Sequence, residues 1–345
     1  MIPHSRPWIT EVDRQVVQSV LASGMIANGT QAGELERSVC GYLSVNRAVL
    51  QSSGTAALVL ALRTLKISTG DEVVLQTYVC RSVLESVLHV GATPVFCDVD
   101  DTGVITEETV APYITSKTKA IIAVHLFGHP CDVQMLKKYR VPVIEDACQA
   151  LGLTIDGKMA GALGDIGVLS FHATKCLTTG EGGMLVTQNT ALGERALQLA
   201  EGTTTPTSRN LAPLSDLQAA LGLSQLSRYS DFLKRRNELR HKYTEAAQRL
   251  GIATGGSEKS NMLLRFTLRT KQPFEIVQSE FRAQGISARR GVDELLHRTL
   301  RLNDTAFPTA VRLYQQTVSV PFHPSLSIEE SVAVCKAFGV VKLGY

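Results

Sequence analysis

The chain has 345 residues, of which 44% are apolar and 19% are charged, and its formal net charge is +3. This composition is typical of a folded enzyme, and the length allows one large and one smaller domain. So small a net charge gives no reason to expect binding to nucleic acid or to a membrane. The N-terminus lacks the apolar run of a signal peptide, and the seven cysteines include no C-x-x-C pair. We therefore expect a reduced, cytoplasmic protein without a structural metal.

The first half of the chain alternates between amphipathic segments and short apolar runs. The pattern predicts helices over 10–23, 54–65, 80–90 and 132–139, and strands over 72–76, 93–97, 119–124 and 141–145. Such alternation is typical of a mainly parallel α/β sheet with helices on its faces. His125 and His129 have no carboxylate or cysteine at a suitable spacing, so no metal site is expected there.

Two of these strand ends have residues suited to binding a cofactor. Residues 48–58 read AVLQSSGTAAL, a strand that breaks into small residues before a helix. The N–H groups at such a helix N-terminus can bind a phosphate. Residues 141–148 read VPVIEDAC and end a strand at Glu145-Asp146. An aspartate at the carboxyl end of a parallel strand can pair with the ring nitrogen of pyridoxal phosphate (PLP) and keep it protonated.

Lys175 lies between two apolar runs, 166–171 and 184–186, next to a turn that is rich in threonine and glycine. A lysine between two buried strands is partly removed from water, which lowers the pKa of its amine and favours Schiff-base chemistry. A solvated loop lysine would fit the local pattern equally well. The phosphate cradle, the carboxylate and the lysine nevertheless follow one another in the order that a PLP enzyme needs.

The C-terminal third predicts a smaller α+β domain. A helix over 191–201 and a polar loop precede long helices over 217–250, a strand over 262–268, and helices over 273–284 and 327–338. We therefore divide the chain into a large PLP-binding domain, residues 1–225, and a small domain, residues 226–345. No independent chemistry is expected in the small domain, where His297 and His323 are interpreted as structural or peripheral.

At this point the chain resembles the DegT/DnrJ/EryC1/StrS family of PLP-dependent sugar aminotransferases. The similar motifs are SSGTAAL (52–58), GDEVVLQTYV (70–79), GATPVFCDVD (91–100), VHLFGHPCD (124–132), IEDACQALG (144–152), SFHATKCLTTGEGG (170–183) and SDLQAALGLSQL (215–226). The resemblance implies the fold-type-I, aspartate aminotransferase-like architecture, with a mainly parallel sheet of the seven-stranded type. It also implies a homodimer with shared active sites.

The resemblance assigns a role to each matching residue. Lys175 would hold PLP covalently and later move protons, while Asp146 would pair with the pyridine nitrogen. Gln149 would lie by the ring hydroxyl, and Tyr78 would stack on the ring. The phosphate would be held by Gly54, Thr55, Ala56 and Ser170.

One segment departs from the family pattern. Relatives usually read G-Y-N-Y-R-M-S-D, where the asparagine reaches the partner's PLP phosphate, whereas residues 208–216 here read SRNLAPLSD. Counting back from Asp216 places Leu211 in the asparagine position and Pro213 in the arginine position. Because Pro213 restricts the backbone, a shift of one residue that brings Asn210 to the phosphate is favoured over loss of the contact.

The resemblance implies transfer of an amino group from an amino acid, glutamate by analogy, to a keto group of a nucleotide-activated sugar. This activity belongs to amino-sugar, surface-polysaccharide or secondary-metabolite biosynthesis. A PLP-dependent deoxysugar dehydratase and a non-catalytic PLP-binding regulator are the alternatives. Lys175 argues against the dehydratase, since dehydratases of this kind usually have histidine at that position. A Rossmann oxidoreductase lacks support because no G-x-G-x-x-G motif follows a strand.

Overall fold

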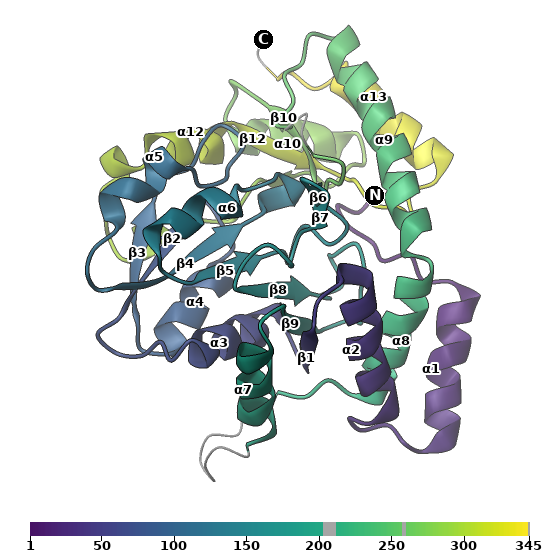
Figure 1. The fold of residues 1–345 in the computed structure, drawn as a ribbon. Helices are drawn as coiled ribbons and strands as arrows, with labels where there is room; N and C mark the ends of the chain where they lie inside the picture. The colour runs from purple at the N-terminus through teal and green to yellow at the C-terminus, as the bar shows by residue number, and fades with distance from the viewer. Residues whose placement is uncertain (203–211, 257–259, 344–345) are drawn as a thin grey trace.

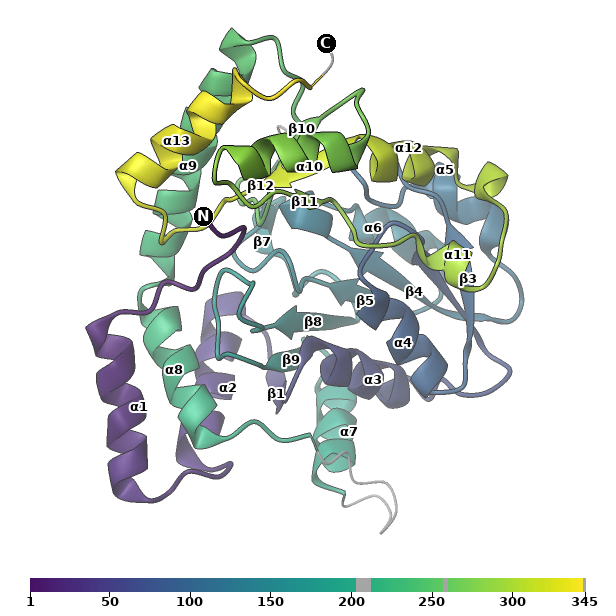
Figure 2. The same ribbon diagram turned by 180° about the vertical axis from the view of Figure 1, so that it is seen from behind.

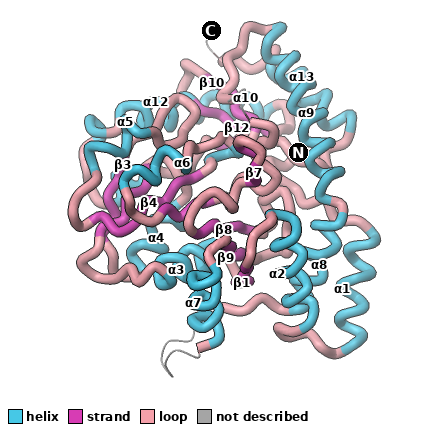
Figure 3. Tube along the Cα trace, in the orientation of Figure 1, coloured by secondary structure: helices cyan, strands magenta, loops and turns pink. Residues whose placement is uncertain are grey.

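The computed structural model describes residues 1–202, 212–256 and 260–343, and its centre is a seven-stranded sheet (Figures 1 and 3). The strand order is β1-β9-β8-β5-β4-β2-β3. These strands are β1 (Arg47–Gln51), β2 (Glu72–Gln76), β3 (Thr93–Cys97), β4 (Thr118–Val124), β5 (Val143–Asp146), β8 (Ile166–Ser170) and β9 (Gly183–Thr187). Only β9 runs antiparallel to its neighbours β1 and β8. The prediction of a mainly parallel α/β sheet is confirmed.

Both faces of this sheet are buried, because alternate residues of each strand enter different cores. In β8, Val168 joins the core beneath α3, whereas Leu169 joins the core on the opposite face. The first core contains α3 (Gly54–Thr64), with α4 (Arg81–His89) and α7 (Thr190–Glu201) packed beside it (Figure 2). The second core contains α2 (Thr30–Leu43), which packs on β1 and on α8 (Asp216–Ser227). A sheet covered on both faces explains why its strands read as nearly continuous apolar runs.

Shorter elements complete this part of the chain. They are α1 (Glu11–Ser23), α5 (Glu107–Val110), α6 (Val133–Leu136), and the hairpin of β6 (Thr154–Ile155) and β7 (Lys158–Met159). The single helix predicted over 132–139 is wrong in detail. α6 passes into a 3₁₀ turn, Lys137–Tyr139, and the left-handed φ of 55° at Arg140 ends it.

The C-terminal part forms its own core around the antiparallel sheet β10-β12-β11. Its elements are α9 (Tyr229–Arg249), β10 (Phe266–Arg269), α10 (Phe274–Ala283), β11 (Arg289–Arg290), α11 (Leu296–Thr299), α12 (Pro308–Gln316), β12 (Thr317–Val320) and α13 (Ile328–Phe338). The rings of Tyr243, Phe266 and Phe338 meet at its centre. Ile2 pairs with Ile286, so the N-terminus also packs on this sheet.

The strand predicted from residue 262 begins only at Phe266. The buried guanidinium of Arg236 on α9 donates hydrogen bonds to the carbonyls of Leu263 and Leu264. Because the backbone N–H of Leu264 donates to Phe127 at 2.8 Å, this segment bonds to the large sheet's loops rather than to β12. The apolar run in the sequence therefore begins before β10 does.

A buried charge network supports the end of β5, where the candidate site lies. The Glu145 carboxylate accepts hydrogen bonds from the N–H groups of Gly161, Leu163 and Gly164, at 2.7–2.8 Å. The Nε2 atom of His125 lies 2.8 Å from Glu145, and its Nδ1 accepts from the N–H of Cys131. Nε2 is therefore the protonated nitrogen, and both ring nitrogens of His125 are engaged in hydrogen bonds.

Replacing Glu145 by Gln is expected to lower the free energy of unfolding by about 3 kcal/mol, since the amide N–H₂ would face backbone donors. Burial alone would raise the pKa of Glu145, but the His125 and backbone hydrogen bonds lower it. The stabilisation is therefore present above the ordinary glutamate pKa of about 4.3, and disappears as pH falls through the lower folded-state value. Urea unfolding of both proteins between pH 3 and pH 7 measures this, with the exposed Glu245→Gln as control. A difference that stayed constant with pH would contradict the charge network.

Candidate active site

Lys175 lies in the connection between β8 and β9, at the edge of the sheet where β5 also ends. Its backbone N–H donates to the carbonyl of His172 at 2.8 Å, which fixes the turn. The side chain is half-buried and lines a pocket between the two parts of the chain. Within the described residues its amine makes no hydrogen bond or ion pair. The structure therefore leaves this amine available at the pocket wall.

The glycines after Lys175 allow a close approach. Gly183 begins β9, and a Cβ atom there would lie 2.3 Å from the carbonyl of Ser53. The β9 backbone can therefore lie directly against the start of α3, which a side chain would prevent. The Ser53 hydroxyl in turn caps α3, accepting from the N–H of Ala56 at 3.1 Å.

The start of α3 meets the end of β8, as expected for a phosphate cradle. A Cβ on Gly54 would lie 3.0 Å from the Cβ of Ser170 and 3.3 Å from its hydroxyl. The first N–H groups of a helix have no intrahelical partners. Thr55 and Ala56, the next two residues, are half-buried. The helix N-terminus and the Ser170 hydroxyl therefore offer a set of donors that fits the phosphate of the expected cofactor.

Asp146 ends β5 and is 2% exposed. Its Oδ1 accepts from the N–H of Cys148 at 3.0 Å, and the Cys148 thiol also interacts with this carboxylate. The Cys148 sulfur lies 3.3 Å from the position of a Cβ on Gly54. Cys148 thus connects the carboxylate to the phosphate cradle. A buried carboxylate with spare acceptor capacity fits a protonated ring nitrogen.

Asp146 and Lys175 lie near the same two cysteines, because both charges shift the pKa of each thiol. Burial raises the pKa of the Cys148 thiol well above its ordinary value, the Asp146 carboxylate raises it further, and Lys175 opposes the rise. Cys80 is exposed to solvent, yet the protein atoms packed around its thiol raise its pKa, and the same two charges act on it. The sequence did not single out either thiol, although Cys148 follows Asp146 by two residues.

Gln149 lines the same pocket as Lys175. Its Oε1 accepts from the N–H of Phe127 at 3.0 Å, and Phe127 has a positive φ of 58°. Tyr78 is 1% exposed and does not line the pocket. Its hydroxyl would lie 2.0 Å from a Cβ on Gly291, so its ring extends toward the C-terminal part of the chain. Asn210 lies outside the described residues.

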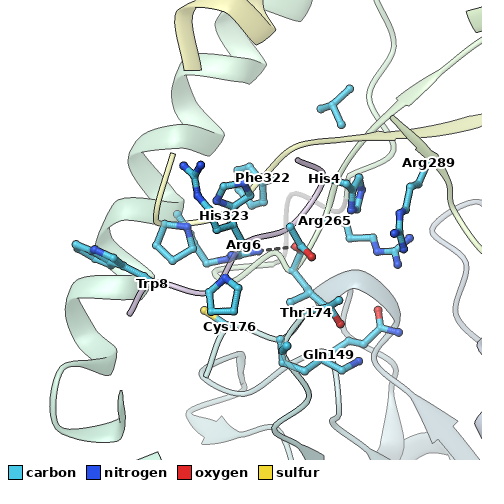
Figure 4. Close-up of a pocket in the computed structure, with 18 residues that line it drawn as sticks. His4, Arg6, Trp8, Gln149, Thr174, Cys176, Arg265, Arg289, Phe322 and His323 are labelled. Carbon is cyan, nitrogen blue, oxygen red and sulfur yellow. Dashed lines mark hydrogen bonds between the residues drawn. The ribbon is translucent and has the colours of Figure 1, made fainter. Parts of the chain in front are cut away.

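Basic residues from distant parts of the chain form the other walls of this pocket (Figure 4). They are Arg6, Arg236, Arg265, Arg289, His4 and His323. Burial lowers the pKa of His323 to about 4, so this imidazole is neutral near pH 7. We had predicted no independent chemistry in the C-terminal third, which contributes Arg236, Arg265, Arg289 and His323 to this pocket.

Gly54→Ala is expected to weaken PLP binding by about tenfold, because its Cβ would displace the Ser170 hydroxyl from the cradle. Gly41→Ala on α2 is the control, since a Cβ there meets nothing within 4 Å. Titration of the apoprotein with PLP, followed by absorbance, measures both dissociation constants. Equal affinity in the Gly54 variant would place the phosphate elsewhere.

Comparisons with known proteins agree with this geometry. The DegT/DnrJ/EryC1/StrS aminotransferase family model matches residues 7–339. The GDP-perosamine synthase of Escherichia coli O157:H7 is 32% identical, covering 97% of both chains. The spore coat polysaccharide biosynthesis protein SpsC of Bacillus subtilis is 31% identical, covering 97% of this chain and 96% of SpsC. The PLP form of Spr1654 from Streptococcus pneumoniae superposes with a TM-score of 0.91 at 29% identity, covering 98% of both chains. This chain therefore belongs to the DegT/DnrJ/EryC1/StrS aminotransferase family.

Proposed function

We propose that this protein is a PLP-dependent aminotransferase. It would move an amino group from an amino acid, with glutamate as the first donor to test, to a keto group of a nucleotide-activated sugar. The observation that carries the proposal is the amine of Lys175 at the pocket wall, which has no hydrogen-bond or ion-pair partner among the described residues, in a chain of this family. The names of the relatives, among them a GDP-perosamine synthase, support a nucleotide sugar as the amino acceptor and amino-sugar biosynthesis as the context.

The residues present fit PLP. Its phosphate would be held by the N–H groups of Gly54 and Thr55 at the start of α3 and by the Ser170 hydroxyl. Ala56 would join them only if its N–H left the Ser53 hydroxyl, to which it donates at 3.1 Å. Asp146 would hold the proton on the ring nitrogen, and Gln149 would contact the ring hydroxyl through its amide nitrogen. Tyr78 would stack on the ring; like Asp146 and the residues of the phosphate cradle, it lies outside the set that lines the pocket beside Lys175.

When bound, PLP supplies an electron sink that stabilises negative charge at the carbon that loses its proton. Lys175 is proposed to take that proton from the amino donor and to return it on the cofactor side, as a general acid–base. Its position on a short turn between two buried strands keeps the amine in place for both transfers.

The proposal is tested by the two half-reactions of the purified, PLP-loaded protein. Addition of glutamate should convert the yellow cofactor band to the amine form and release 2-oxoglutarate in equal amount. Addition of a nucleotide-linked keto sugar should then restore the yellow band. A protein that binds PLP but releases no keto acid from any donor in an amino-acid panel would instead be the non-catalytic regulator.

We further propose a cytoplasmic homodimer and a division into domains at residues 225/226, near the junction of α8 and α9. Exposed apolar side chains on and after α1 support self-association; they are Val12, Leu21, Met25 and Ile26. Among the described residues, no helix is both long and apolar enough to span a bilayer. Light scattering after size exclusion should give twice the chain mass of 37.3 kDa. An active species of single-chain mass would contradict shared active sites.

A further inference from the structure

The pocket beside Lys175 has an excess of positive charge. The eighteen residues that line it include four arginines and one lysine, but no aspartate or glutamate. Arg6 is already paired, since its guanidinium lies 2.7 Å from the Glu330 carboxylate. Arg236 is 4% exposed and donates to two backbone carbonyls. Arg265 and Arg289 are the arginines whose positive charge remains to be explained.

Arg265 is fixed by hydrogen bonds from one of its nitrogens, and its other N–H donors are unused within the described residues. Its Nη1 donates to the carbonyls of Gly291 at 2.8 Å and Arg290 at 3.2 Å, and the guanidinium lies 5.2 Å from the centroid of the Phe127 ring. Within the described residues, Nη2 and Nε of Arg265 make no hydrogen bond. A guanidinium fixed along one edge and open along the other is prepared for a planar oxyanion.

Arg289 lies near Arg265. It belongs to β11, its side chain is exposed, and among the described residues it has no hydrogen bond or ion pair. Figure 4 shows Arg265 and Arg289 on the same side of the pocket, with His4 beside them. Burial lowers the pKa of His4, and the charges of Arg265 and Arg289 lower it further, so His4 adds no charge at neutral pH. Two neighbouring guanidiniums thus face the pocket. Burial lowers the pKa of Arg265 and the charge of Asp293 opposes this, but within the described chain Asp293 forms no ion pair with either arginine.

We propose that Arg265 and Arg289 form an oxyanion subsite that binds a carboxylate or phosphate group of a substrate and directs the rest of that substrate toward Lys175. An oxyanion between the two guanidiniums would remove their mutual repulsion and use the free edge of Arg265. The inference rests on the proposed aminotransferase function. Its two possible ligands, the carboxylate of the amino donor and the phosphate of the nucleotide sugar, share this chemistry.

Arg289→Gln is the principal test, because within the described residues the exposed Arg289 side chain makes no hydrogen bond or ion pair whose loss would affect folding. The expected result is a rise of about tenfold or more in KM for the substrate whose oxyanion is bound, with kcat changed less than about twofold. Arg289→Lys should show a smaller rise, since a point charge replaces the fork. Arg282→Gln, an exposed arginine on α10 outside the pocket, is the control of equal charge change.

The kinetics distinguish the two ligands. A higher KM for glutamate alone assigns the subsite to the donor carboxylate, and a higher KM for the nucleotide sugar alone assigns it to phosphate. Unchanged KM values for both substrates in Arg289→Gln would overturn the proposal, even if the enzyme is a fully active aminotransferase.

Calorimetry with glutarate and with inorganic pyrophosphate tests the subsite without turnover. The PLP-loaded wild type should bind one of these probes, and Arg289→Gln should bind it about tenfold more weakly than Arg282→Gln does. Arg289-dependent binding in a protein that transaminates nothing would support the subsite and reject the proposed function. Failure of the wild type to bind either probe would reject the subsite.

Discussion

Lys175→Ala is expected to reduce transamination at least about a thousandfold, because the variant loses both the covalent attachment of PLP and the proton-transferring amine. Stability should change by less than about 0.5 kcal/mol, since the amine makes no hydrogen bond within the described residues. Both half-reactions should fail, because each of them needs a proton to be moved. The measurements are single-turnover rates with glutamate and the free energy of unfolding in urea.

Chemical trapping locates the reactive amine directly. Borohydride reduction of the wild type, followed by peptide mass spectrometry, should place the pyridoxyl group on the peptide that contains Lys175. Lys336→Ala, which removes an exposed lysine of α13, should retain both the label and the activity. A label on another lysine, or a Lys175→Ala protein with normal turnover, would show that the assignment is wrong.

Asp146→Asn has the second-largest expected effect, a loss of turnover of at least about tenfold. A charged partner for the ring nitrogen at a desolvated site contributes about 1.5–3 kcal/mol or more, and asparagine supplies no charge. The fold should persist, because the asparagine oxygen can still accept from the N–H of Cys148 as Asp146 does at 3.0 Å. The experiment compares kcat and the free energy of unfolding with those of the wild type.

Asp156→Asn is a matched control for this substitution. Asp156 is exposed in the turn between β6 and β7 at a φ of 48°, a conformation that asparagine tolerates well. The Asp156→Asn substitution changes charge and size in the same way as Asp146→Asn, but at a position away from the candidate site. If Asp146→Asn kept full turnover, the ring nitrogen would have another partner.

Much of the fold could be predicted because the relevant signals are local. The strands 72–76 and 93–97 were predicted with the bounds that the structure has, since each is a short apolar run between clear turns. The error at β10 has the opposite origin. Leu263 and Leu264 are as apolar as typical strand residues, but their carbonyls accept hydrogen bonds from Arg236 instead of from a neighbouring strand. Arg236 lies 27 residues before Leu263, so no local pattern shows this contact.

The candidate site divides in the same way. Asp146 and Lys175 could be proposed from sequence because each stands at a strand end, and parallel strands bring such ends to one edge. The burial of Tyr78 against Gly291 could not be predicted from the sequence, because no residue near Tyr78 in the chain indicates what packs on it.

By itself, the sequence determined the α/β class, the order of phosphate cradle, carboxylate and lysine, and through these the family. Local periodicity and side-chain chemistry are sufficient for such conclusions. Only the tertiary structure decided that His4, Arg265 and Arg289 face the same pocket as Lys175. Their convergence depends on the N-terminal residues pairing with the segment before β11, as Ile2 does with Ile286. A contact between residues so far apart in the chain forms only when the whole chain packs, and no local pattern encodes it.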